Sequence, residues 1–525
     1  MKRRISLLLA MTMLLLILLP ALPFAAVAEE THEAKIVSTD NSETHYATLS
    51  AAAAALTDGD TLVLLSDVTV TQTNIWIKGN NITVDGNGKS ITYTGSDYLF
   101  AVSGGTAAAY TGSDATAAAS LPVGTVTFKN MNITAASGGG FKFYFQTHLI
   151  LGEGVNTNVY NIVVLAARAG GTLTVDGGVH TATNGSLFSM SSGCVVNACR
   201  GYGVAPGGNA VFSVASGSTL NVYGGYFENT GAYRVITGSD TATATINVYG
   251  GALAVRNVGV VLRSGGTRNI YGGAFSNMQT AADRGDGKAT NIFCITGGFS
   301  NANPFYTFYM SEGGSTQAGS ESVIAPNGET FYTSTTLDLP ATNRGASARL
   351  VEGSSGLRFT TNIPKAIIDY ASSMADSGTQ VSYGTVICPT DYLATLAIFT
   401  MDGLDGKGRT YQNIVAEDGI TENADGSVTI RAALVDIQKS SREFSAVGYL
   451  KYIKDGHEVY IYGIYDREAN SRSMEQIATA ALNDISTEIT SVYAYPVEGG
   501  YSPYSPEQRA ILLSYVCEDS TADPF

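Results

Sequence analysis

A short pattern of hydrophobic and polar residues recurs through the middle of the chain. Each copy spans six residues: polar residues fill the second and fourth positions in most copies, apolar residues alternate with them, and glycine closes the copy. The sixth-position glycines are spaced 23, 24, 26, 22 and 25 residues apart, at Gly178, Gly201, Gly225, Gly251, Gly273 and Gly298. Alternation with a period of two predicts a strand, and a repeat of about 24 residues predicts one solenoid coil per copy.

The alternation also assigns the two faces of each strand. The first and third positions are apolar and are predicted to fill the interior of the coil, as with Leu220, Val222, Ile246 and Val248. Arg268 departs from this pattern. The second and fourth positions then face outward, and equivalent residues of successive coils lie ~4.8 Å apart. The sequence therefore predicts an outward ladder of Asn221, Asn247 and Asn269 beside a stripe of Tyr223, Tyr249 and Tyr271.

The residues between the copies supply further strands and an upstream cap. A second strand follows the glycines, as in Tyr226–Asn229, and a third lies in Val211–Val214. Upstream, Tyr46–Leu56 is typical of a short helix, and Asp58–Leu65 of a strand. Three strands per coil behind a helical cap resemble the pectate-lyase-like superfamily of right-handed parallel β-helices, over residues 40 to 312. The resemblance implies a fold but no activity, because that superfamily contains lyases, hydrolases and non-catalytic adhesins.

The last third of the chain has a different pattern. Residues 313–344 are rich in Ser, Thr, Gly and Pro and are interpreted as a linker. Beyond them, capping boxes at Ser473 and Ser505 predict two helices, and Asp455-Gly456 predicts a hairpin turn. The segments Gly356–Thr360, Arg442–Tyr452 and Tyr501–Leu512 resemble an accessory domain of secreted proteins from anaerobic Firmicutes. The predicted architecture is mainly β: a signal peptide at 1–28, a β-helix at 29–312, a linker at 313–344 and a smaller α+β domain at 345–525.

The first residues are typical of an export signal. Three basic residues, Lys2–Arg4, precede an apolar run at Ile5–Leu19, and Ala26–Ala28 gives the small-x-small pattern of a cleavage site. We therefore expect a secreted, extracellular protein with no membrane span once the signal is removed. The formal net charge of −15 argues against nucleic acid as a partner.

No familiar catalytic or metal-binding motif stands out in the sequence. The five cysteines are scattered, and a disulfide between Cys194 and Cys199 is left open. The carboxylates of the repeat region, such as Asp176 and Glu228, do not form the adjacent pair of β-helix hydrolases. Asp402–Gly408 is interpreted as a solvated turn. The sequence predicts neither a metal site nor a cofactor.

The tyrosine stripe and its asparagines are the candidate binding site. Exposed aromatic rings on a rigid sheet suit sugar rings or a partner protein, whereas rings covered by another part of the chain would serve stability. We expect an adhesin-like, non-enzymatic protein that binds a polysaccharide or a surface protein. The alternative is a polysaccharide lyase or glycoside hydrolase acting on a pectin-like polysaccharide, which would need carboxylates, or a basic residue and a carboxylate, converging in one groove. A third possibility is a spacer that displays the C-terminal domain.

Overall fold

The computed structural model describes most of the β-helix and of the C-terminal domain. The described residues are 32–104, 122–168, 170–231, 233–239, 243–255, 261–264, 266–277, 300–301, 309–311, 321–324, 330–333, 341–396, 398–463, 465, 467–489 and 494–517. The predicted signal peptide and the sixth repeat copy, which ends at Gly298, lie outside these residues.

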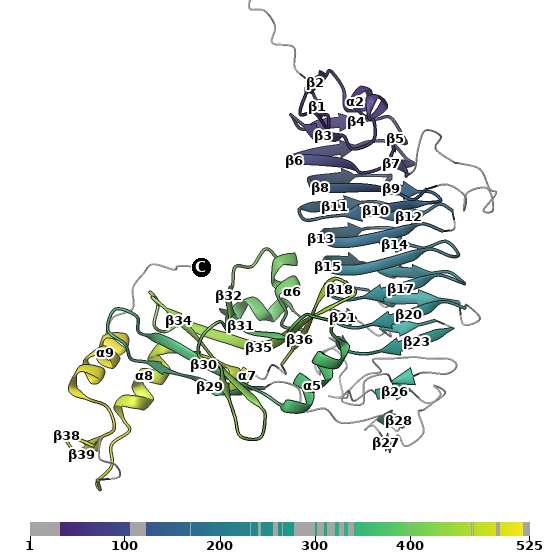
Figure 1. Ribbon diagram of the computed structural model, residues 1–525. Coiled ribbons are helices and arrows are strands. Elements are labelled where there is room, and N and C mark those ends of the chain that lie inside the picture. Colours follow the sequence, from purple (N-terminus) through teal and green to yellow (C-terminus); the bar gives the residue numbers. More distant parts are fainter. Residues whose placement is uncertain are drawn as a thin grey trace, which may run out of the picture.

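A parallel β-helix of about seven turns, each of roughly 24 residues, forms the column in Figure 1. Its strands stack in two parallel sheets, because each strand pairs with the equivalent strand one coil away. The larger sheet holds the first two strands of each coil: β3 (Thr61–Leu64), β4 (Val68–Val70), β6 (Ile82–Tyr93), β8 (Gly124–Ala135), β10 (Thr147–Leu151), β11 (Val155–Val159), β13 (Thr172–Ala182), β15 (Val195–Ala205), β17 (Thr219–Val222), β18 (Tyr226–Asn229), β20 (Thr245–Val248), β21 (Ala252–Val255), β23 (Thr267–Ile270), β24 (Ala274–Asn277) and β25 (Ser300–Asn301). The smaller sheet holds the third strands: β5 (Ile75–Lys78), β7 (Tyr98–Ser103), β9 (Gly139–Phe143), β12 (Val164–Ala166), β14 (Phe188–Ser189), β16 (Phe212–Val214), β19 (Ile236–Gly238) and β22 (Leu262–Arg263).

The predicted register of the repeat is confirmed. Val196 pairs with Leu220, and Leu220 pairs with Ile246, so equivalent positions of the repeat lie side by side. The four side chains predicted to face inward are fully buried in one continuous core: Leu220, Val222, Ile246 and Val248.

The sixth-position glycines form the corner between the first and second strands. Gly178 has a φ of +79°, and a Cβ there would lie 2.0 Å from the carbonyl oxygen of Val155 in the preceding coil. Only glycine fits this conformation and this close approach, which explains why glycine recurs with the coil period.

An N-terminal cap covers the first coil. Helix α2 (Leu49–Ala55) begins at Thr48, whose hydroxyl accepts from the Ala51 N–H, and its buried face includes Leu49 and Ala52. Two short antiparallel strands, β1 (Ala34–Val37) and β2 (Glu43–Tyr46), complete the cap, and β1 pairs antiparallel with β3.

The C-terminal domain lies beside the lower coils (Figure 1). One sheet contains β29 (Ala341–Arg349), β30 (Gly356–Ile363), β34 (Val428–Val435) and β33 (Thr421–Glu422). The other contains β32 (Gln412–Val415), β31 (Ser382–Pro389), β35 (Glu443–Lys454), β36 (His457–Tyr462) and β37 (Ser471–Ser473). The helices are α5 (Lys365–Met374), the 3-10 helix η1 (Thr390–Thr395), α6 (Met401–Gly406), α7 (Arg467–Asn470), α8 (Met474–Leu482) and α9 (Pro506–Cys517). Smaller pieces are the hairpin β38 (Tyr495–Val497) and β39 (Gly500–Ser502), and the sheet of β26 (Tyr309–Ser311), β27 (Glu321–Ile324) and β28 (Thr330–Thr333).

Three local predictions for this domain are confirmed. The capping box at Ser505 precedes α9, with reciprocal hydrogen bonds between Ser505 and Gln508. The capping box at Ser473 begins α8, with reciprocal hydrogen bonds between Ser473 and Gln476. The Asp455-Gly456 turn joins β35 to β36 in a hairpin.

Candidate functional site: two grooves and a covered tyrosine ladder

The asparagine and tyrosine ladders have the predicted geometry. The ring centroids of Tyr223 and Tyr249 are 5.1 Å apart, those of Tyr249 and Tyr271 are 4.7 Å apart, and the planes of each pair differ by 5°. Beside them, Asn247 Nδ2 donates to Asn221 Oδ1 at 2.8 Å, and Asn269 Nδ2 donates to Asn247 Oδ1 at 2.9 Å. Each amide therefore continues a hydrogen-bonded stack along the outer face of the coils.

The C-terminal domain contacts this tyrosine ladder, burying Tyr223 and leaving Tyr249 and Tyr271 half-buried. Tyr223 is only 4% exposed: its hydroxyl donates to Asp455 Oδ2 at 3.1 Å, and its ring centroid lies 4.6 Å from that of His457. The hydroxyl of Tyr370, on α5, donates to the carbonyl oxygen of Tyr271 at 2.7 Å. The sequence left two roles open for these rings: binding a partner if exposed, or stabilising the fold if covered by another part of the chain. The contacts with the C-terminal domain correspond to the second role. The three tyrosines line an interface between domains.

Helix α6 makes the second part of this interface. It packs on the stacked rings of Tyr202 and Tyr226, which lie on the second strands of successive coils. A Cβ at Gly406 would lie 1.9 Å from the Tyr202 ring, so the helix approaches closely only because it carries glycine there. The segment interpreted as a solvated turn therefore includes a helix packed against the β-helix, and that interpretation was wrong.

Two carboxylates bind across the interface. Asp402 of α6 accepts hydrogen bonds from the backbone N–H groups of Gly201 and Gly225, both at 3.1 Å. Glu228 is fully buried, forms an ion pair with Lys407 Nζ at 3.0 Å and accepts from the Tyr202 hydroxyl. Burial raises the pKa of Asp402 to about 6 despite these hydrogen bonds.

The cysteines left open by the sequence are free thiols. Cys194 Sγ donates to the carbonyl oxygen of Arg168 at 3.2 Å, and Cys199 Sγ lies 3.3 Å from His457 Nδ1. Burial, with the nearby charge of Asp176, raises the pKa of Cys199 to about 12. Cys199 is therefore a protonated contact of the interface and not an activated nucleophile.

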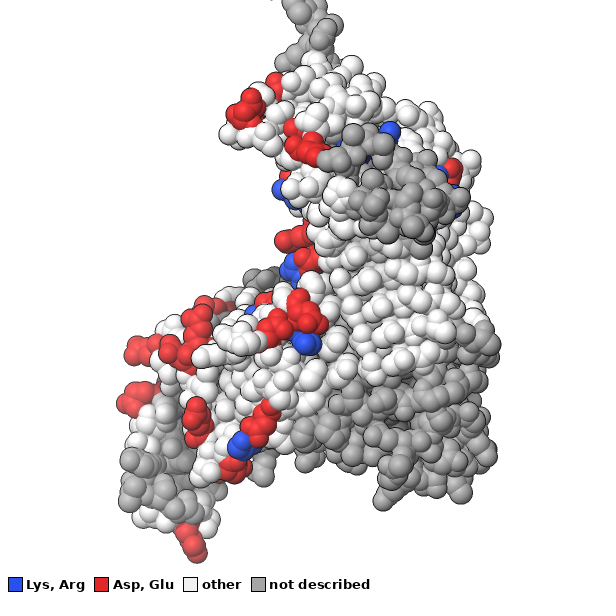
Figure 2. Space-filling view, turned by 45° about the vertical axis from the view of Figure 1, so that its right-hand side comes forward, with Lys and Arg blue, Asp and Glu red and all other residues white. Residues whose placement is uncertain are grey.

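A charged cleft of about 270 Å³ opens where α6 meets the coil corners. Glu153, Asp176 and Arg200 reach it from successive corners, and Asp402 and Asp405 reach it from α6. Arg200 Nε donates to Asp176 Oδ1 at 2.8 Å. Figure 2 shows charged side chains gathered along the concave side of the molecule, between the column and the C-terminal domain. Sequence reasoning missed this cleft because its two walls are some 200 residues apart in the chain.

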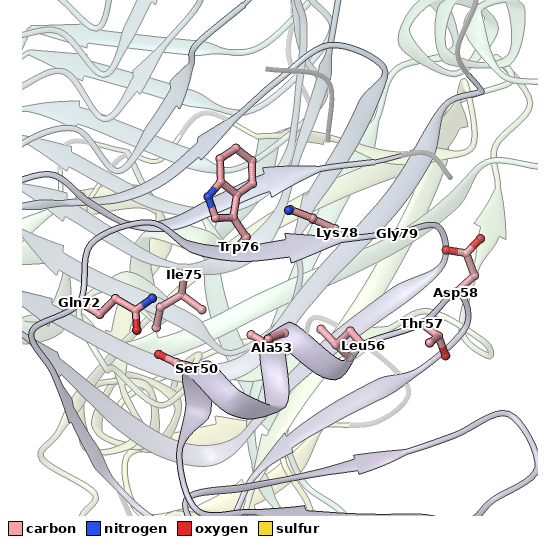
Figure 3. A pocket seen from close by; sticks show the side chains of 11 residues that line it. Ser50, Ala53, Leu56, Thr57, Asp58, Gln72, Ile75, Trp76, Lys78 and Gly79 are labelled. Atoms are coloured by element: carbon pink, nitrogen blue, oxygen red, sulfur yellow. The ribbon is translucent and has the colours of Figure 1, made fainter. Parts of the chain in front are cut away.

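A larger groove of about 560 Å³ lies at the N-terminal cap, between α2 and β5 (Figure 3). Strand β5 alternates in the usual way: Ile75 and Ile77 are buried in the coil, while Trp76 and Lys78 point outward. Trp76 is the only tryptophan in the chain; it stacks on Tyr144 at 5.3 Å, and Lys78 Nζ lies 5.1 Å from the Trp76 ring. The other lining residues are Ser50, Ala53, Ala54, Leu56, Thr57, Asp58, Gln72 and Gly79.

A backbone hydrogen bond holds one polar group of this groove, the Asp58 carboxylate, in place. Asp58 Oδ1 accepts from the Asn80 N–H at 2.9 Å, so its carboxylate is fixed at one end of the groove near Gly79. Sequence reasoning did not single out this site, although alternation within Ile75–Lys78 was the available signal that Trp76 faces outward.

The described part of the chain holds no group of three or more His, Cys, Asp or Glu side chains placed to bind a metal ion. Within the same residues, no helix is long and apolar enough to span a membrane. No protein-family model, curated protein or solved structure was found to match the chain.

Proposed function

We propose that the protein is exported and acts outside the cell as a non-enzymatic, adhesin-like β-helix that binds a glycan at the groove beside Trp76. The supporting observation is the make-up of that groove. An indole ring provides an apolar surface suited to a sugar ring, and the hydroxyl, amide, carboxylate and ammonium groups around it can bind sugar hydroxyls. The resemblance to secreted β-helix proteins supports the same reading.

We assign glycan binding to this groove and not to the tyrosine ladder. Tyr223 is buried against the C-terminal domain, and Tyr249 and Tyr271 are half-buried, so the ladder offers a polymer less ring surface than an open stripe would. The groove is open, lies at the far end of the column from that domain and is twice the volume of the charged cleft.

A glycan array on the mature protein, followed by calorimetric titration with the best hit, tests this proposal. Trp76→Ala should weaken binding at least tenfold, and Trp76→Phe should retain much of it, because a ring remains. Tyr160→Ala is the matched control, since Tyr160 is an exposed ring outside the groove. Unchanged affinity of Trp76→Ala, or no glycan bound at all, would refute the proposal.

Export has its own test. Expression of the full chain in a secreting bacterial host should release a protein whose first residue is Glu29, as read by N-terminal sequencing. A protein retained in the cells with Met1 intact would contradict export.

A glycoside hydrolase remains the second candidate, because the charged cleft brings carboxylates and an arginine into one groove. The hydrogen bond from Arg200 to Asp176 raises the pKa of the guanidinium, which therefore stays charged and is unsuited to act as a base. Hydrolysis by two carboxylates fits this site better than elimination does. The expected signs are new reducing ends from a pectin-like polysaccharide and their loss in Glu153→Gln; no product from any polysaccharide tested would exclude this candidate.

A further inference from the structure

The contacts of the C-terminal domain with the β-helix fall mainly on positions that the repeat provides in every coil. Gly201 and Gly225 are the sixth-position glycines of successive copies, and Asp402 places one carboxylate oxygen on the N–H of each. One side chain thus binds two coils at their common corner.

The aromatic contacts use repeated positions in the same way. Tyr223, Tyr249 and Tyr271 occupy the fourth position of three successive copies, facing the β35–β36 hairpin and α5. Gly250, at the fifth position, lets the hairpin approach: a Cβ there would lie 3.0 Å from Val459 Cγ1. The position recurs in every copy, but tyrosine fills it only in these three: the two copies before them carry Asp176 and Cys199 there. The ladder therefore already favours these coils over those nearer the N-terminus.

A different pair of residues marks one coil. Glu228 pairs in register with Val204 of the preceding coil and Ala254 of the next, so a carboxylate occurs at this position in only one of the three coils. Lys407 binds that carboxylate at 3.0 Å in a buried site. Moving the domain by one coil would leave Glu228 buried without its cation, at a large cost in free energy.

We propose that the C-terminal domain is a docking module for parallel β-helix coils. It recognises the corner amides and stacked tyrosines of the repeat, and the ion pair between Lys407 and Glu228 strengthens its selection of the coil at which it binds. The domain therefore holds the β-helix without needing the covalent connection between them. This inference is independent of the proposed glycan binding.

The test uses the full chain with a specific protease site inserted between residues 334 and 340. After the folded protein is cut, the two pieces should elute together in size-exclusion chromatography at micromolar concentration, and dilution should give a dissociation constant. Separation of the pieces while both keep their circular dichroism spectra would overturn the proposal.

Three variants identify the contacts responsible. Asp402→Ala leaves two corner N–H groups without their acceptor, Lys407→Met leaves the Glu228 carboxylate without its cation, and the triple change of Tyr223, Tyr249 and Tyr271 to Ser removes the ladder. Each should weaken association of the cut pieces at least tenfold. Asp369→Asn is the matched control, because Asp369 lies on the exposed face of α5 and pairs only locally with Lys365. If all three variants bind as tightly as the unaltered chain, docking does not depend on the repeat and the proposal fails.

Discussion

A single histidine in the lumen links the stability of the β-helix to pH. His180 is fully buried, its Nε2 lies 3.0 Å from the Gly177 carbonyl oxygen, and its Nδ1 lies 3.0 Å from Thr157 Oγ1. A carbonyl oxygen can only accept, so Nε2 carries the proton and Nδ1 accepts from the threonine hydroxyl. The neutral ring satisfies every contact.

Burial lowers the pKa of His180 to about 4, below its ordinary value of 6.5. The stabilising contribution is therefore present above pH 6.5 and is lost as the pH falls from 6.5 toward 4. We expect the free energy of unfolding to drop by about 2 kcal/mol between pH 7 and pH 5. Urea titrations at both pH values test this, and His180→Gln should show a smaller drop; equal drops in the two proteins would contradict the assignment.

Two valines provide a second test at the scale of the residue. Val248→Asp would place an unpaired charge in the lumen, where the side chain is fully buried, and should cost roughly 4 kcal/mol or more. Val123→Asp makes the same chemical change at a side chain that is 56% exposed and should cost under about 0.5 kcal/mol. Thermal melts of both variants decide the matter, and similar losses in the two would mean that the assigned faces are wrong.

At the scale of the element, the coil corner is the least tolerant position. Gly178→Ala combines a strained positive φ with a Cβ at 2.0 Å from the Val155 carbonyl oxygen, so the two coils must separate locally. We expect a loss of about 2 to 3 kcal/mol. Gly208→Ala is the control: no atom lies within 4 Å of its Cβ position, and its melting temperature should stay the same or rise slightly.

The elements that the sequence predicted well are those that repeat. Period-two alternation in Ile246–Gly251 shows directly which side chains enter the lumen, because a strand has only two faces. Helix α6 was missed because its six residues include two glycines, which disfavour helices. The Thr400 cap and the contact with Tyr202 stabilise it, and neither is visible in a local pattern.

The candidate sites were harder to predict for a related reason. The sequence predicted which three tyrosines form the ladder and which face they occupy. It did not predict their partner, because the Asp455–His457 hairpin follows more than 180 residues later in the chain. Sequence periodicity states which face a residue occupies and does not state what covers that face. Trp76 was missed because it lies in a coil outside the recognisable copies of the repeat.

At the scale of the whole molecule, Asp402 makes the seam between the domains sensitive to pH. Its pKa is raised from 3.8 to about 6 by burial, and the charge of Asp405 adds to this rise, while the N–H groups of Gly201 and Gly225 and the charge of Arg200 oppose it. The protonated form is therefore favoured in the docked state. The contribution of protonated Asp402 to the free energy of docking is fully present below pH 4 and is lost as the pH rises through 6.

We expect the cut pieces to associate more tightly at pH 5 than at pH 7, by a few fold to tenfold. Fluorescence titration of one labelled piece with the other measures this difference. The Asp402→Ala variant should bind more weakly and with less dependence on pH, and an unaltered pH dependence in that variant would assign the effect to another group.

The N-terminal cap determines whether one column can grow onto another. A stack of parallel strands ends in a row of unpaired backbone groups, which can template the addition of a further chain, as at the tip of an amyloid fibril. Here the direction of pairing reverses at β1, and the last strand, β2, is four residues long, exposed and charged at Glu43, which pairs with Lys35. A chain that begins at Thr57 would expose β3 and the open lumen. It should self-associate through this edge, with a larger mass in analytical ultracentrifugation than the chain that retains the cap at the same concentration.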